Sequence, residues 1–287
     1  MTLSSLDTFI QAFNRSVTTC SCEDVMALNA RDDITGWSLE PDDNFMSVGR
    51  LESVASEKMR NIANIQIVAE RDKWFFGDEQ IACLTYLTDK TIVYRDGRES
   101  SFNNIRVTWY LENQVDSWQI RHGHWSVAWD PAVIKPYKPI PVRSEMINKA
   151  SCRAEGQQLE PFQAWLQQCT DAVRNKEIEK LVSELWVQDD NLLCWPIVDC
   201  SAMCSRQQIV DFGQERLRDV RIDMHFQNPV VFLGGDYACL STDILLEKEY
   251  ASTGERFSVA PVRGTYILEY QGGSWRARHG HLSLPCF

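Results

Sequence analysis

One segment in the first half of the chain recurs near its end. RHGHWS at residues 121–126 returns as RHGHLS at residues 278–283, and the two segments hold four of the five histidines. The same offset of 157 residues relates Trp118 to Trp275 and Thr108 to Thr265. It also relates the aspartate pair at residues 32–33 to the pair at residues 189–190. A repeat this long contains a whole domain rather than one unit of a solenoid, so we predict two copies of one domain.

A proline-rich segment separates the two copies. Its four prolines are Pro131, Pro136, Pro139 and Pro141. Proline removes a hydrogen-bond donor and favours extended chain, which is typical of a stiff linker. We therefore expect a first domain over residues 1–130, a linker over residues 131–150 and a second domain over residues 151–287.

Each copy shows the same order of elements. Helical periodicity covers residues 6–17, 21–30 and 49–61 in the first copy, and residues 162–175, 177–186 and 205–219 in the second. A short apolar strand containing Trp37 or Trp195 precedes the third helix. The remainder alternates with period two and has glycine-bearing turns such as QGGS, which indicates antiparallel strands. The order predicts an α+β fold with about three helices packed on one face of a sheet.

Charge and composition exclude several classes of protein. A net charge of −11 argues against a nucleic-acid-binding face and against binding to anionic membranes. The sequence has no apolar stretch of about eighteen residues and no secretory signal, so we expect a cytoplasmic protein with reduced cysteines. The ten cysteines lack the paired spacing of zinc knuckles, and we expect neither a metal nor an organic cofactor.

The ordered motifs resemble a known family. The aspartate pair, the following tryptophan, a GR or SR that opens the third helix, and a last strand DSWQIRHGHWS or GSWRARHGHLS resemble the nuclear transport factor 2-like superfamily, especially its SnoaL-like branch. The resemblance covers nearly the whole chain, twice. It implies that each domain is a cone, in which a curved sheet wraps around helices with a pocket between them. It also implies that the two copies pair as an intramolecular pseudo-dimer, with a further homodimer as an option.

The resemblance implies several functions, because this fold does not fix one. The family includes ketosteroid isomerase, scytalone dehydratase, limonene epoxide hydrolase and polyketide cyclases, and also the small subunits of ring-hydroxylating dioxygenases. Our first hypothesis is a cofactor-independent acid–base enzyme, an isomerase, dehydratase, cyclase or lyase, acting on a hydrophobic or aromatic metabolite in a cone pocket. The alternatives are a non-catalytic small-molecule binding protein and an interaction or assembly domain. One working cone and one structural cone would fit a duplicated chain.

The histidine pairs are the first candidates for catalysis. If the last strand is regular, one face carries the side chains of Trp118, Ile120, His122, His124 and Ser126. Tryptophan and isoleucine belong against a core, so we expect the imidazoles, including His279 and His281 in the second copy, to point into the cone. A bulge centred on Gly123 or Gly280 would turn one of them outward. There they would transfer protons near neutral pH or, alternatively, pack as hydrogen-bonded core groups; metal binding is least favoured, because a third ligand is not evident.

Other polar and aromatic side chains are further candidates. An acidic residue at the end of the second helix, Asp33 or Asp190, can enter a pocket as an acid or base, or can simply cap the turn. Trp37 and Trp195 are candidates for lining a ligand cavity. Arg221, Asp223, His225 and Gln227 share one strand face in the second copy only, where Asp223 and His225 form a candidate catalytic pair or a solvated surface. Arg106 and Arg263 would bind an anionic ligand group or lie on the outer face.

Overall fold

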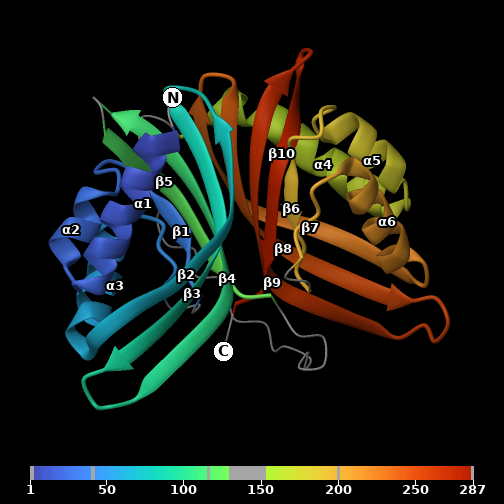
Figure 1. Ribbon diagram of the computed structural model, residues 1–287. Helices are drawn as coiled ribbons and strands as arrows, with labels where there is room; N and C mark the ends of the chain where they lie inside the picture. Colours follow the sequence, from blue (N-terminus) through green and yellow to red (C-terminus); the bar gives the residue numbers. More distant parts are fainter. Residues whose placement is uncertain (1–2, 40–42, 115–116, 129–152, 199–200, 286–287) are drawn as a thin grey trace. The chain divides into compact units, whose positions relative to one another are not determined.

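Two compact units make up the chain (Figure 1). The computed structural model describes residues 3–39, 43–114, 117–128, 153–198 and 201–285. The first unit includes the described residues up to Val127, and the second runs from Arg153 to Pro285. The linker predicted at residues 131–150 lies outside the described residues, so each unit is considered by itself.

The helices form where the periodicity predicts them. The first unit contains α1 (Leu3–Thr18), α2 (Cys22–Ala27) and α3 (Val48–Asn61). The second contains the 3-10 helix η3 (Gly156–Leu159), α4 (Glu160–Arg174), α5 (Ile178–Leu185) and α6 (Arg206–Leu217). A serine caps the third helix of each unit: Ser47 accepts from the backbone N–H of Arg50, and Ser205 from that of Gln208. Such caps satisfy amide groups that the helix leaves unpaired.

Each unit has one five-stranded sheet with the same topology. The first sheet has the order β1-β5-β4-β3-β2 and the second has the order β6-β10-β9-β8-β7. The short strand, β1 or β6, runs parallel to its neighbour, and the remaining pairs are antiparallel. The strands are β1 (Thr35–Trp37), β2 (Ile62–Gly77), β3 (Ile81–Tyr94), β4 (Glu99–Gln114), β5 (Ser117–Ser126), β6 (Leu193–Trp195), β7 (Val220–Gly234), β8 (Tyr237–Tyr250), β9 (Arg256–Gln271) and β10 (Ser274–Ser283). The predicted α+β architecture is confirmed in both units.

The helices cover one face of each sheet, which we call the inner face (Figure 1). In the first unit, Trp109 of β4 contacts Phe9 and Phe13 of α1 at ring-centroid distances of 5.4 and 4.6 Å. In the second, Tyr266 of β9 contacts Trp165 of α4 at 5.1 Å. Residues that alternate with these point to the opposite, outer face.

A β-bulge in the last strand of each unit reverses the predicted side-chain directions. In β5, His122 lies opposite Tyr110 and Ile120 opposite Leu111, so that Arg121 is an extra residue in the ladder. Arg278 is the extra residue at the same point of β10. A one-residue shift moves every later side chain to the other face. The prediction that the histidines point into the cone is therefore wrong: His122, His124, His279 and His281 lie on the outer faces. The bulge precedes the glycine that we had expected to carry it, and it turns both members of each pair.

Candidate functional site

The outer-face histidines join the last strand to the short parallel strand. His122 Nδ1 lies 2.8 Å from Thr35 Oγ1, and His279 Nδ1 lies 3.1 Å from the Leu193 carbonyl oxygen, to which it donates. Both imidazoles are fully buried. Burial lowers the pKa of His122 to about 3 and that of His279 to about 3. Neutral rings that hold strands together fit the packing alternative better than proton transfer near neutral pH, and the catalytic role stays a prediction.

Two more predicted site residues, Trp37 and Trp195, share the outer faces. Trp195 of β6 packs against His279 and His281 with centroids 5.6 and 5.1 Å apart. Trp37 occupies the matching position on β1, opposite His124. Because each pairs with a histidine of the last strand, both tryptophans lie on the sheet face opposite the helices.

The two predicted ligand-binding arginines are buried on the outer face, the alternative favoured from the sequence. Arg106 donates from Nε to Ser126 Oγ at 3.0 Å and from Nη2 to the Val127 carbonyl at 3.2 Å. Arg263 lies opposite Asp243 in the β8–β9 ladder. Burial raises the pKa of the Asp243 carboxyl, and the charge of Arg263 opposes that rise. These contacts stabilise the strands, and binding of an anion by either arginine stays a prediction.

The bulge arginines are bound by the first aspartate of each pair. Arg121 donates to Asp32 and to Glu112. In the second unit, Arg278 Nη1 and Nη2 donate to the two carboxylate oxygens of Asp189 at 2.8 and 2.9 Å, and Nε donates to Glu269. This bidentate geometry fixes the guanidinium plane.

The second aspartate of each pair, our candidate acid or base, differs between the units. Asp33 is buried with 2% of its surface exposed, and Asp190 is exposed. The structure does not place either of them on the inner face of a sheet strand, because both precede the short strand in the loop that follows the second helix. Their roles as acid or base stay predictions.

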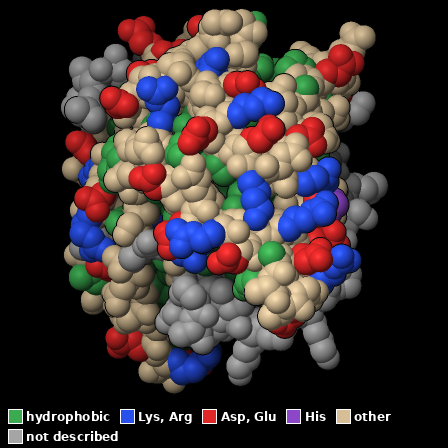
Figure 2. Space-filling view, turned by 90° about the vertical axis from the view of Figure 1, so that its right-hand side faces the viewer, with side chains coloured by type: hydrophobic (Ala, Val, Ile, Leu, Met, Phe, Trp, Pro, Cys, Tyr) green, Lys and Arg blue, Asp and Glu red, His purple; other side chains and the backbone are tan. Residues whose placement is uncertain are grey.

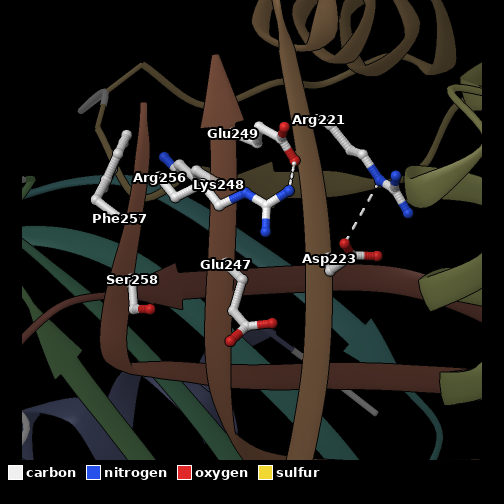
Figure 3. A pocket seen from close by; sticks show the side chains of 8 residues that line it. All are labelled: Arg221, Asp223, Glu247, Lys248, Glu249, Arg256, Phe257 and Ser258. Carbon is white, nitrogen blue, oxygen red and sulfur yellow. Dashed lines mark ion pairs between the residues drawn. The ribbon is translucent and has the colours of Figure 1, made fainter. Parts of the chain in front are cut away.

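A charged groove of about 330 Å³ crosses β7, β8 and β9 in the second unit (Figure 3). Asp223 is held by Arg174 at 2.5 Å and by Arg221 at 3.5 Å, and hydrogen bonding from Arg174 lowers the pKa of its carboxyl. His225 pairs with Glu247 at 3.0 Å rather than with Asp223, and both are largely exposed. The groove is lined by Arg221, Asp223, Glu247, Lys248, Glu249, Arg256, Phe257 and Ser258. The β7 side chains predicted to share one strand face do so, and their charged groups form solvent-exposed ion pairs, as in the alternative of a solvated surface.

The inner face of the first unit is filled by aromatic rings. Trp109 lies at the centre, with Phe13 at 4.6 Å, Phe9 and Tyr86 each at 5.4 Å, and Trp125 at 6.2 Å. Trp109 and Tyr86 are 0% and 2% exposed. Large, mutually packed rings of this kind make a core rather than a cavity.

The second unit carries smaller side chains at most of the matching positions. The cross-strand pair Val107–Trp125 corresponds to Gly264–Leu282, because each occupies the same rung of the ladder. Trp109 corresponds in the same way to Tyr266. Two further rings of the first unit, Tyr86 and Phe13, are replaced by Thr242 and Cys169, whereas Phe9 is replaced by the larger Trp165. The aromatic side chains on the inner face of the first unit are thus replaced in the second unit by side chains that are mostly smaller and more polar.

One buried donor in this set lacks a partner within the described part of the chain, and a phenol lies beside it. Trp165 Nε1 is buried without a hydrogen bond, and its side chain is only 4% exposed. The Tyr266 side chain, 8% exposed, contacts the Trp165 ring and lies near the thiols of Cys169 and Cys194. Burial raises the pKa of Tyr266 well above its ordinary value, so the phenol stays protonated. Trp109 Nε1 is also unpaired, but it lies among the rings of the first unit.

These inner-face residues were missed from the sequence, although a signal for them was present. Aligning the copies by their common offset places Gly264 against Val107, Tyr266 against Trp109 and Leu282 against Trp125. Each change reduces side-chain volume, and the three positions are neighbours on two adjacent strands. Positions that match between the two copies indicate the fold, whereas positions that differ between them indicate the candidate site.

Several broader features of the chain bear on function. In the described residues, groups of three or more side chains with metal-ligand chemistry do not occur, and the described helices are too short or too polar to cross a membrane. The seven cysteines that the structure describes form no disulfide with one another. Figure 2 shows acidic and basic side chains interspersed over the face that it presents, rather than gathered in a patch of one sign.

Comparisons with known proteins match both units to one family. The sequence profile of the SnoaL-like domain matches residues 6–130 and residues 163–286. Comparison with curated proteins gives no match. A solved NTF2-like superfamily protein from Salmonella enterica serovar Typhimurium LT2 is similar, with 13% identity, coverage of 47% of this chain and 96% of that chain, and a TM-score of 0.41. A ketosteroid isomerase-like protein from Erwinia carotovora atroseptica SCRI1043 is similar at 14% identity, over 45% and 97% of the two chains, with a TM-score of 0.38.

Proposed function

The chain belongs to the SnoaL-like domain family through both of its halves, and we propose that its second unit binds a hydrophobic or aromatic small molecule on the inner face of its sheet. The first unit, whose inner face is filled by rings around Trp109, serves as a structural partner. The proposal shifts the candidate site from the histidines, on the outer faces, to the residues around Tyr266.

The observation that carries the proposal is an unpartnered buried donor, Trp165 Nε1, beside the ring of Tyr266. A buried donor without a partner costs about 1–3 kcal/mol, so a native structure keeps one only for a reason. A ligand carbonyl or hydroxyl oxygen would accept from this group. The surrounding side chains, among them Leu240, Leu268 and Val231, are apolar and suit the rest of such a ligand.

Binding is supported better than acid–base catalysis. The residues predicted to transfer protons in this unit do not share the inner face with Tyr266: His279 and His281 lie on the outer face, and Asp190 lies in the loop before the short strand. Catalysis by an isomerase, dehydratase, cyclase or lyase is the second candidate, favoured by one observation: burial keeps the Tyr266 phenol protonated, as a donor to a substrate oxygen must be.

The proposal is tested by filling the second unit with the side chains of the first. The neutral fluorophore N-phenyl-1-naphthylamine, titrated into the full-length protein, is expected to show saturable binding. In the double variant Gly264→Val/Leu282→Trp, the added volume should weaken binding at least about tenfold, the equivalent of ~1.4 kcal/mol. Gly264→Ala is the milder variant; its methyl group would approach Ile244 Cδ1 and Tyr266 Cε2 at 3.1 and 3.2 Å, and it should give a smaller loss.

Val68→Ser is the control for probe binding to the surface. It removes an apolar side chain that is 65% exposed in the first unit, and it should leave affinity unchanged. Circular dichroism and thermal unfolding establish that each variant is folded. Wild-type affinity in the folded Gly264 variants would refute the proposal.

A further inference from the structure

Lys248 occupies a position where the first unit has a buried isoleucine. It lies opposite Ile222 in the β7–β8 ladder, as Ile92 lies opposite Ile65 in the β2–β3 ladder. Ile92 is 8% exposed and belongs to an apolar cluster. The second unit thus carries an ammonium group on the same sheet face where its counterpart carries an alkyl side chain.

This ammonium group has no acidic partner among the described residues. Lys248 Nζ lies 5.6 Å from the centroid of the Phe257 ring, and it makes no ion pair with the residues that the structure describes. The other charged residues of the groove are paired, for example Arg256 with Glu249 at 3.0 Å, and Figure 3 draws no ion pair to Lys248. Burial and the neighbouring charge of Arg216 lower the pKa of Lys248, so an anion placed between the two cations would favour the charged form.

Apolar and aromatic side chains connect Lys248 with the interior of the second unit. Its neighbours Ile222 and Met224 on β7 pack both against the main cluster of that unit and against the smaller cluster of Ile244 and Leu246. Tyr250 contacts Phe257 at a centroid distance of 5.5 Å and is 40% exposed. The inner face therefore offers an apolar path that ends at an unpaired cation.

We propose that the ligand of the second unit is a hydrophobic organic anion whose charged group binds Lys248, with Arg216 adding to the positive potential. This inference rests on the proposed function, since it assumes that the apolar body of the ligand enters the second unit. A charge-assisted hydrogen bond from the ammonium to a carboxylate or sulfonate would replace the missing partner. The Phe257 ring would pack against the apolar part next to that group.

Two probes with one skeleton test the inference. The anion 1-anilinonaphthalene-8-sulfonate and the neutral N-phenyl-1-naphthylamine differ by the sulfonate, and both are titrated into the full-length protein by fluorescence. Wild type should bind the anion more tightly. Lys248→Met should weaken the anion roughly tenfold and leave the neutral probe unchanged. Lys90→Met is the matched control, because Lys90 lies 5.8 Å from the Phe102 ring in the first unit; it should change neither affinity.

The outcomes separate this inference from the proposed function. Neutral-probe binding that is sensitive to Gly264→Val/Leu282→Trp, together with anion binding unaffected by Lys248→Met, overturns the inference alone. Equal losses for both probes in Lys248→Met also overturn it, because the charge would then not be recognised. If neither probe binds, or if the Gly264 variants bind the probes with wild-type affinity, the proposed function fails and this inference fails with it.

Discussion

Arg121 and Arg278 show how one extra residue determines which sheet face the later side chains of a strand occupy. Each is the extra residue of its bulge, and each is held by an aspartate and a glutamate. The sequence shows the aspartate pairs and the arginines, but it does not show that they meet, because they are far apart along the chain. The acid–base role was predicted for Asp33 and Asp190, whereas the ion pairs are made by the preceding aspartates.

The Asp189–Arg278 pair should be visible in the stability of the protein at acid pH. Hydrogen bonding from Arg278 lowers the pKa of Asp189 below its ordinary value of 3.8. The pair therefore contributes its full stability above that value and loses it as the pH falls through the lower folded-state pKa. Asp189→Asn should lower the free energy of unfolding at pH 7 by about 1 kcal/mol at most, because the carboxylate is half exposed and screened.

Urea unfolding at pH 7, 4 and 3 measures this effect. The difference between wild type and Asp189→Asn should shrink toward pH 3. Asp190→Asn, a change at the exposed neighbouring position, is the control and should match wild type throughout. A constant difference at all three pH values would show that the ion pair is not its source.

At the scale of elements, the helices and strands were predictable and the faces of the last strand were not. Periodicity and capping serines are local properties, so α1, α3, α4 and α6 appear where the sequence indicates. A bulge depends on the hydrogen-bond ladder with the neighbouring strand, which a single strand's alternation does not reveal. Trp118 and Ile120 do face the core as expected, and the bulge after Ile120 sends His122 and His124 to the other side.

The buried histidines predict a second pH effect, at milder acidity. Burial lowers the pKa of His279 to about 3, below the ordinary value of 6.5, so the unfolded chain takes up a proton first as the pH falls. Stability should therefore decline between pH 6.5 and about 3. His279→Gln, which keeps a donor for the Leu193 carbonyl, should remove roughly 1 kcal/mol of the loss between pH 6.5 and 5.5.

Guanidinium unfolding at these two pH values, on wild type and His279→Gln, measures this effect. If His279→Gln retains the full wild-type loss, the imidazole is already protonated or exposed in the folded protein.

At the scale of the whole molecule, duplication explains why one unit can change while the other keeps its core. The first unit retains rings around Trp109, and the second replaces them with Gly264, Tyr266 and Leu282. The duplication and the fold were predictable because the repeat recurs over most of each half. The choice of working unit was not, because it depends on which side chains meet on the inner face. The pseudo-dimer and a further homodimer stay predictions.

The indole signals of the two units test the central claim most directly. Full-length protein labelled with ¹⁵N only in its tryptophan side chains is titrated with 2-acetylnaphthalene, a neutral aromatic ketone. Trp165 Nε1–H should shift as it donates to the ketone oxygen, while Trp109 Nε1–H should stay in place among its rings. Assignment by single Trp→Phe variants identifies each signal. A shift of Trp109 with Trp165 unmoved, or no shift at any concentration, would contradict a ligand site in the second unit.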